Sequence, residues 1–193
     1  MTIREANSSE IGELTGLLVR AFDQDPVLRY LIPQDNDWQR AAPRYFSLVL
    51  HNTLKRGYTT VEGNGNGVAL WEPPDATIPL PRQLINLAVM TKIYRRNLAQ
   101  VLRVQAATQK YKPRRPCWYL TYIATDPDHQ RTGIGQKLLQ PIVELAESNR
   151  QPVYLECSNE LNLPFYFAQG FNLVEVVQVP DGPKLWPMLR ESR

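Results

Sequence analysis

The spacing of hydrophobic residues predicts a strand and then helices at the start of the chain. Thr2–Ala6 suits a short strand, and Ser8 or Ser9 can cap a helix whose apolar side chains recur every three or four positions. The apolar face of that helix is Ile11, Leu14, Leu17, Leu18, Ala21 and Phe22. Asp25-Pro26 marks a turn or a helix start, and the short apolar helix after it ends at Pro33.

A longer helix and a hairpin follow. The pattern predicts a helix from about Asn36 to Lys55, with Pro43 as a candidate kink. Tyr58–Glu62 and Val68–Trp71 are two strand-like runs, and the residues between them, Gly63–Gly67, tolerate positive φ angles. This segment therefore predicts a β-hairpin.

The second half of the chain alternates between strands and helices. Trp118–Thr125 is a continuous run of aromatic, β-branched and aliphatic residues, which is typical of a strand buried on both faces, so we expect it to be central. Before it, residues from about Gln83 to Gln109 predict one or two helices. After it we expect, in order, helix Gly133–Asn149, strand Val153–Cys157, helix Leu163–Gln169, strand Phe171–Val179 and a last strand near Leu185–Arg190.

Composition narrows the class of protein. A chain of 193 residues predicts a single domain spanning residues 1–193, and 43% hydrophobic with 21% charged residues excludes a wholly disordered protein. No run of 18 apolar residues and no secretory signal is present, so we expect a cytoplasmic protein without a membrane partner. Two cysteines and two histidines match no zinc spacing, which predicts two reduced thiols and no metal.

Charge is distributed unevenly. The net charge of +3 is too small to indicate a nucleic-acid partner. However, the stretch from Ala76 to Thr125 contains no acid and carries +9, which leaves −6 for the rest. Its cations are Arg82, Lys92, Arg95, Arg96, Arg103, Lys110, Lys112, Arg114 and Arg115. Either acids from elsewhere in the fold neutralise this stretch, or it forms a positive surface that attracts an anionic ligand.

The segment that indicates chemistry is Thr125–Gln140, a strand that passes through a short turn into a helix opened by glycines. Gly133 and Gly135 let a ligand approach the backbone, and the first N–H groups of a helix lack internal partners, so such a turn can bind a diphosphate. The third glycine of a dinucleotide fingerprint would fall at Leu138, so that motif is absent. The alternative is an ordinary helix start that contains two glycines.

Two motifs resemble one enzyme family. Gln130-Arg-Thr-Gly-Ile-Gly135 is similar to the Q/R-x-x-G-x-G/A motif of the GNAT N-acetyltransferases, and Asn162–Phe171 resembles the tyrosine-bearing helix and Gly-Phe of that family's second signature. Further segments look like puromycin N-acetyltransferases: Lys112–Leu120, Asp126–Gln130, Tyr154–Ser158, Asn162–Tyr166 and Val179–Pro183. The resemblance implies the GNAT fold, an α/β architecture with a mixed, mostly antiparallel sheet of about six to seven strands flanked by helices.

The same resemblance implies an activity. It is the transfer of an acetyl group from acetyl-CoA to a primary amine of a small molecule, by direct attack in a ternary complex. The backbone of Ile123, Ala124 and Thr125 would pair with the pantetheine arm, and the Ile123 N–H would face the thioester oxygen. The turn residues implied to bind the cosubstrate are Gln130, Arg131, Thr132, Gly133, Ile134, Gly135 and Gln136. A plain core strand at Ile123–Thr125 is compatible with this role.

Tyr166 is the expected general acid, as it is in the family. A phenol of pKa about 10 can protonate a departing thiolate of pKa about 8.5 at little cost. The alternative is one more core aromatic beside Phe165 and Phe167. Asn159 and Asn162 can bond the pantetheine amides, or they can simply cap a helix.

The sequence indicates the general base less clearly than it indicates the general acid. Many members of the resembled family that act on lysine carry a glutamate where this chain has Tyr119. Glu156 on the neighbouring strand is the first candidate, Glu72 is the second, and a water relay is the third. Glu156 has an alternative role as a strand-end carboxylate that binds backbone or arginine. Cys157 is not expected to carry the acetyl group, because no histidine stands near it in sequence.

Two other functions remain open at this level. One is acetylation of a protein amine. The other is a catalytically silent regulator that binds acyl-CoA, which the tyrosine at position 119 favours. An exposed sheet edge is compatible with either a monomer or a homodimer.

Overall fold

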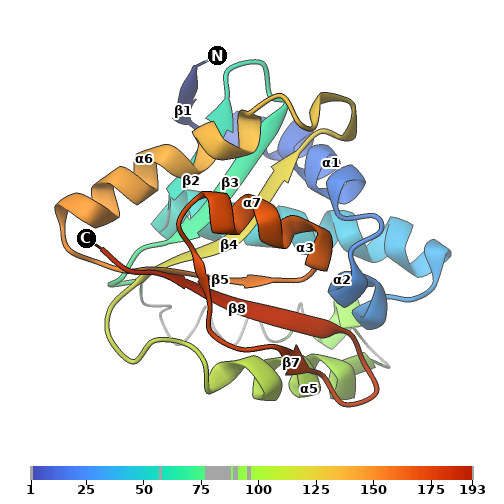
Figure 1. Ribbon diagram of the computed structural model, residues 1–193. Coiled ribbons are helices and arrows are strands. Elements are labelled where there is room, and N and C mark those ends of the chain that lie inside the picture. Colours follow the sequence, from blue (N-terminus) through green and yellow to red (C-terminus); the bar gives the residue numbers. More distant parts are fainter. Residues whose placement is uncertain (1, 57, 77–87, 89–90, 95–96, 193) are drawn as a thin grey trace.

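A mixed, mainly antiparallel sheet forms the middle layer of the protein (Figure 1). The computed structural model describes residues 2–56, 58–76, 88, 91–94 and 97–192, and over these residues the sheet has eight strands. The strands are β1 Ile3–Glu5, β2 Tyr58–Glu62, β3 Gly67–Glu72, β4 Trp118–Thr125, β5 Val153–Cys157, β6 Asn172–Leu173, β7 Val177–Gln178 and β8 Lys184–Arg190. Their order is β1-β2-β3-β4-β5-β8-β6, with β7 also paired to β8, and the β4/β5 pair is parallel.

Helices cover both faces of this sheet. They are α1 Ile11–Ala21, α2 Pro26–Leu31, α3 Asp35–Arg56, α5 Leu98–Gln109, α6 Ile134–Ser148 and α7 Leu163–Ala168. Figure 1 shows α6 and α7 in front of the sheet and α3 behind it. Each side buries its own hydrophobic cluster, one built around Phe46 and Leu50 of α3 and the other around Leu138 and Leu139 of α6. The predicted α/β class with a mixed, mostly antiparallel sheet is confirmed.

Local sequence signals predicted most element boundaries well. β4 and β5 coincide with the predicted strands, and β4 lies in the middle of the sheet order. The β2/β3 hairpin turns at Gly65, whose φ of 77° is a conformation that favours glycine. Of the helical region expected from Gln83 to Gln109, the structure describes α5, whereas residues 83–87, 89–90 and 95–96 lie outside the described residues.

The predicted strand Phe171–Val179 is divided into β6 and β7. This division brings the sheet to eight strands instead of the expected six to seven. The partner strand β8 contains Pro187, which accepts a bond from the Val174 N–H at 2.9 Å but has no N–H to return. The pairing register with β8 also shifts by one residue between β6 and β7. The ladder is therefore interrupted opposite this proline.

β4 packs against a hydrophobic cluster on each face of the sheet, as expected, because Trp118 and Leu120 belong to one cluster and Ala124 to the other. One smaller expectation was wrong. The first helical segment is capped by Asn7 rather than by Ser8 or Ser9, because the Asn7 side chain accepts from the Ser9 N–H at 2.9 Å. This cap is completed by Glu10, whose carboxylate accepts from the Asn7 N–H at 2.9 Å.

We expect this N-terminal cap to make stability depend on acidity. Hydrogen bonds from Arg4, and next from the Asn7 backbone, lower the pKa of Glu10 to about 2. A lowered carboxyl pKa stabilises the folded state above the unfolded value of about 4.3, and this contribution disappears as the pH falls through that value toward 2. Glu10→Gln should therefore cause a small loss of stability at pH 7 that shrinks below pH 4. Urea denaturation at pH 7 and at a pH below 4 measures this loss of stability. An equal loss at the two pH values would contradict the prediction.

Candidate functional site

The parallel strands β4 and β5 separate halfway along their length. They pair through Trp118–Val153, Tyr119–Tyr154 and Leu120–Leu155, after which β4 continues to Thr125 without this partner. Figure 1 shows the two strands diverging beyond this point. A bulge lies at the same place on the other side of β4, where the register with β3 shifts between Leu70 and Trp71. The divergence leaves one side of the end of β4 unpaired by β5.

The backbone of Ile123 and Thr125 is directed toward this gap. Asp126 donates its N–H to the Asn66 carbonyl at 2.8 Å, which makes that pair a hydrogen-bonded one in the antiparallel register of β3 and β4. Since hydrogen-bonded and non-bonded pairs alternate, the amides of Ile123 and Thr125 point away from β3. The amide of Ala124 points toward β3. Two of the three predicted backbone positions can therefore meet a ligand that lies in the gap.

A tight turn leads from β4 into α6. Arg131 and Gly133 have φ angles of 62° and 86°, and the Thr132 hydroxyl donates to the His129 carbonyl at 2.6 Å. Gly133 is the N-cap of α6 and supplies no side-chain cap. The bond from the Lys137 N–H to the Gly133 carbonyl, at 3.2 Å, is the first one of the helical pattern. The preceding amides of α6 thus have no partner inside the helix and can bind an anion.

The two glycines of the turn are needed for different reasons. A Cβ atom on Gly133 would meet open space, so this position depends on its positive φ rather than on room. A Cβ atom on Gly135 would lie 3.3 Å from Cζ of Phe165 in α7. Gly135 therefore lets α7 pack closely against the start of α6, and its predicted role in letting a ligand approach the backbone stays a prediction.

Arg20 ties the start of the turn to α1, a role that the sequence analysis missed. Its guanidinium lies 2.6 Å from Asp126 Oδ2, and this hydrogen bond lowers the pKa of the Asp126 carboxyl. The other carboxylate oxygen of Asp126 accepts from the Asp128 N–H at 3.1 Å. Asp126 thus joins α1, the end of β4 and the following short 3-10 turn, η3 Pro127–His129.

Tyr166 lies on α7, on the same side of the sheet as α6. Only 7% of this residue is exposed, and its ring packs edge-on against Phe165 and Phe171 at centroid distances of 5.1 and 5.9 Å. Burial is the main reason why its pKa is raised, with smaller contributions from Cys157 and Asp25. The hydroxyl therefore stays protonated at physiological pH and can act only as a donor of its proton or as a neutral acceptor.

Glu156 lies on the opposite side of β5 from Cys157. Both of its oxygens accept from tyrosine hydroxyls, Oε2 from Tyr119 at 3.3 Å and Oε1 from Tyr154 at 3.2 Å. The expected alternative, binding to backbone or arginine, is not what these contacts show. Tyr119, which stands where the resemblance led us to expect a glutamate, is itself a hydrogen-bond partner of Glu156, a contact that sequence spacing did not indicate.

Asp25 is a buried carboxylate that the sequence analysis treated only as a helix start. Its Oδ1 caps α2 by accepting from the N–H groups of Val27 and Leu28 at 3.0 and 2.8 Å. Its Oδ2 accepts from the Ser158 hydroxyl, which follows β5. Burial raises the pKa of Asp25, and the bond to Ser158 opposes this shift. Asp25 therefore links α2 to the end of β5, beside the gap.

The remaining predicted residues surround the end of β5. Burial raises the pKa of Cys157 to about 11, and its thiol donates to the Asn159 carbonyl at 3.1 Å, so it is a neutral thiol at pH 7. The Asn159 side chain accepts from the Leu161 N–H at 3.1 Å and caps the short 3-10 turn η4 Glu160–Asn162. Asn162 precedes α7, is exposed, and forms no side-chain cap.

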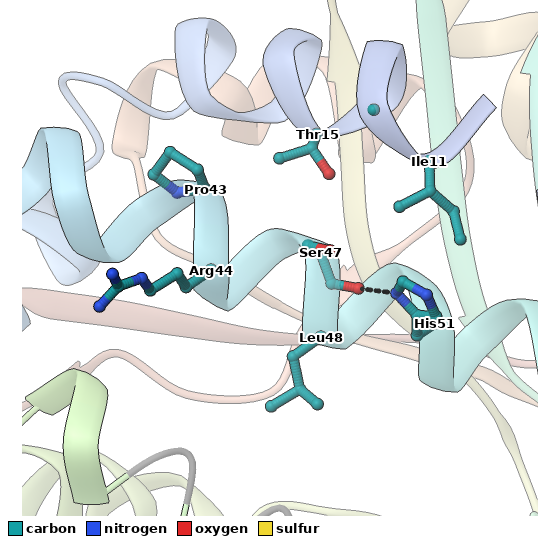
Figure 2. Close-up of a pocket in the computed structure, with 8 residues that line it drawn as sticks. Ile11, Thr15, Pro43, Arg44, Ser47, Leu48 and His51 are labelled. Atoms are coloured by element: carbon teal, nitrogen blue, oxygen red, sulfur yellow. Dashed lines mark hydrogen bonds between the residues drawn. The ribbon is translucent and has the colours of Figure 1, made fainter. Parts of the chain in front are cut away.

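A hollow of about 590 Å³ lies elsewhere, between α1 and α3 (Figure 2). It is lined by Ile11, Gly12 and Thr15 of α1 and by Pro43, Arg44, Ser47, Leu48 and His51 of α3. None of these residues is among the predicted catalytic or cosubstrate-binding residues. In the part of the chain that the structure describes, no cluster of three or more His, Cys, Asp or Glu could hold a metal, and no helix is long and apolar enough to cross a membrane.

The cations of the basic stretch have varied surroundings. Arg103 lies 3.7 Å from Asp181, and Arg115 forms an ion pair with Glu191, so acids from distant segments neutralise these two. Lys110 and Lys112 instead lie over the rings of Tyr111 and Tyr119. Arg82, Arg95 and Arg96 lie outside the described residues, so the expected positive surface around Arg95 and Arg96 stays a prediction.

Comparison with known proteins identifies this arrangement of strands and turn. Residues 91–171 match the model of the acetyltransferase (GNAT) family. The crystal structure of a histone acetyltransferase HPA2 and related acetyltransferase from Corynebacterium glutamicum matches with a TM-score of 0.75 and 24% identity, covering 100% of this chain and 96% of that one. The fold is that of the GNAT acetyltransferases.

Other relatives agree with this GNAT fold. An uncharacterized N-acetyltransferase of Schizosaccharomyces pombe is 24% identical over 183 residues, which cover 89% of this chain and 74% of that protein. A mosquito arylalkylamine N-acetyltransferase like 5b has a TM-score of 0.61 and 14% identity, covering 98% of this chain and 99% of that one. The family model and the Schizosaccharomyces pombe relative support an acetyltransferase, and GNAT acetyltransferases use acetyl-CoA as cosubstrate.

Proposed function

We propose that this protein transfers an acetyl group from acetyl-CoA to the primary amine of a small molecule by direct attack in a ternary complex. The observation that carries the proposal is the gap between β4 and β5, which continues into the glycine turn of α6. An extended arm can add to the unpaired edge of β4 while an anion meets the α6 amides. These are two parts of a ligand in which an extended arm leads to a diphosphate.

The residues around the gap fit acetyl-CoA. The amides from Arg131 to Gln136, together with Gln130, would hold the diphosphate, because Gly133 leaves open space at the helix start. Ile123 and Thr125 would pair with the pantetheine arm. The amide of Ala124 is directed toward β3, so Ala124 would not pair with the arm and would only hold its place between Ile123 and Thr125. Asn162 would form hydrogen bonds to the pantetheine amides. Asn159 would do the same with its side-chain N–H groups, because its side-chain oxygen accepts from the Leu161 N–H.

The chemistry is divided between the two faces of the sheet. Glu156, on the side of α1 and α3, accepts the proton that the attacking ammonium must lose before its nitrogen can bond to the acetyl carbon. The Ile123 N–H donates to the thioester oxygen while that oxygen carries negative charge. Tyr166, on the side of α6 and α7, donates a proton to the thiolate released when the C–S bond breaks. The products are the N-acetylated amine and CoA.

The proposal that the acceptor is a small molecule rests on two resemblances. Several sequence segments look like puromycin N-acetyltransferases, and the mosquito relative is named for arylalkylamines. The Corynebacterium structure is named for histones, which favours a protein amine as the second candidate. A cytoplasmic location, a single domain over residues 1–193, and a monomer or homodimer stay predictions from the sequence.

A panel of amines with acetyl-CoA tests the proposed function. We expect CoA release, followed with a thiol reagent, to accelerate with one or more small primary amines, and the acetylated product to gain one acetyl group by mass spectrometry. Activity only toward peptide amines would favour the protein substrate. Tight CoA binding without any turnover would favour a catalytically silent regulator and would contradict the proposed enzymatic activity.

We expect Gly135→Val to weaken acetyl-CoA binding at least tenfold, equivalent to about 1.4 kcal/mol. The added side chain would push Phe165 and α7 away from the start of α6, which disturbs both the diphosphate turn and the helix that carries Tyr166. Calorimetric titration measures the dissociation constant. Gly12→Val is the control, because a Cβ there meets nothing within 4 Å. An unchanged constant in a folded Gly135 variant would remove the turn from the proposed site.

A further inference from the structure

A lysine of the chain itself lies over one tyrosine ring next to the proposed base. Nζ of Lys112 is 4.4 Å from the ring centroid of Tyr119. Lys112 is exposed and lies in the segment between α5 and β4, whereas Tyr119 is partly exposed on β4. An ammonium over an aromatic face is attracted by the ring quadrupole. This part of the protein surface therefore already accommodates a primary ammonium group.

Tyr119 lies between two carboxylates on neighbouring strands. It lies opposite Glu72 of β3 in the antiparallel register of β3 and β4, and its hydroxyl donates to Glu156 of β5 at 3.3 Å. The pKa of Tyr119 is raised well above its ordinary value, first by burial and then by the charges of Glu156 and Glu72. The negative potential that opposes ionisation of this phenol also favours a cation beside its ring.

The carboxylate of Glu156 is held in one position by a second tyrosine. Tyr154 stacks on Tyr119 with a centroid distance of 5.9 Å and donates to the other oxygen of Glu156 at 3.2 Å. With both oxygens anchored, Glu156 needs little reorganisation to meet a cation. Further along the same face, the hydroxyls of Tyr122 and Tyr45 are hydrogen-bonded to each other and continue the aromatic wall.

We propose that the ring of Tyr119, with Glu156 and Glu72, is a subsite for a positively charged ammonium group of the acceptor, and that Lys112 occupies it until the acceptor binds. This inference rests on the proposed function and names its substrate class, a cationic aliphatic amine rather than a neutral or anionic acceptor. Lys112 can leave because it is exposed, so the acceptor competes with it for the same ring. Removal of Lys112 should then strengthen amine binding.

Binding of a simple amine to the protein without acetyl-CoA tests this subsite separately from catalysis. The probe is n-butylammonium chloride, and its neutral counterpart is n-butanol, both followed by amide NMR titration. We expect n-butylammonium to shift the signals of Tyr119 and Glu156, and n-butanol to leave them unchanged. Lys112→Met should bind n-butylammonium at least threefold more tightly. Lys110→Met is the matched control, because Lys110 is exposed on the same segment and lies 4.7 Å from the ring of Tyr111.

Two substitutions of the tyrosine separate the ring from the hydroxyl. Tyr119→Phe keeps the aromatic face and should bind within a few fold of the parent, whereas Tyr119→Leu should lose at least tenfold in affinity. If the leucine variant does not fold, the comparison of Lys112→Met with Lys110→Met still tests the subsite. Equal affinity in the Lys112 and Lys110 variants, or equal binding of n-butanol, would overturn the subsite. Inactivity toward every amine with intact n-butylammonium binding would instead count against the proposed function alone.

Discussion

Replacement of Tyr166 by phenylalanine is expected to lower kcat by about 10²- to 10⁴-fold, the usual loss when a positioned acid is removed. The effect should appear in kcat, because the hydroxyl acts when the thiolate departs. The dissociation constant of acetyl-CoA should change by no more than a few fold, since the ring remains packed against Phe165 and Phe171. Steady-state kinetics and calorimetry on the same preparation measure both quantities.

Tyr58→Phe is the matched control for this experiment. It removes the same oxygen atom from a residue that is 39% exposed and that packs its ring against Trp118 at 5.2 Å. Its kcat should equal that of the parent. If Tyr166→Phe also keeps full kcat while the chemical step limits turnover, Tyr166 is a core aromatic and has no part in proton transfer.

Glu156→Gln is expected to reduce kcat/KM by a comparable factor, about 10²- to 10⁴-fold, because glutamine cannot take the proton of the ammonium. The amide keeps the shape of the side chain and can still accept a hydrogen bond from Tyr119 or Tyr154. The fold should therefore survive, and circular dichroism with a thermal melt checks this. Amines of lower pKa should lose less activity, because a larger fraction of them is already neutral.

Two other glutamates give this prediction its controls. Glu175→Gln changes an exposed residue between β6 and β7 and should leave kcat/KM unchanged. Glu72→Gln changes the second candidate base, which pairs with Tyr119 across β3. A large loss in the Glu72 variant with little loss in the Glu156 variant would transfer the role of base to Glu72. Full activity in both would favour a proton relay through water.

Much of the fold follows from local patterns in this sequence. β4 and β5 were predicted to the residue, because a continuous run of β-branched and aromatic residues is itself the signal of a central strand. The hairpin and the start of α6 were predicted because Gly65 and Gly133 take positive φ angles, a local property of glycine. Prediction failed at Phe171–Val179, where the interruption comes from Pro187 on the partner strand.

The candidate site was predicted in part, by residue type more than by contact. The motif and its resemblance indicated the glycine turn and Tyr166 without any knowledge of the fold. They did not indicate that Gly135 makes room for Phe165, or that the Ala124 amide is directed toward β3 while Ile123 and Thr125 point to the gap. These facts depend on the distance between two helices and on the register of two strands, which a motif does not encode.

The sequence by itself determined which segments form strands and helices and where a glycine turn opens a helix, because periodicity and glycine act over a few neighbouring residues. Only the tertiary structure decided which side chains meet. Arg20 meets Asp126, Ser158 meets Asp25, and Tyr119 meets Glu156, over sequence separations of 106, 133 and 37 residues. The physical reason is that these contacts are set by the order of strands in the sheet and by the point at which β4 and β5 part.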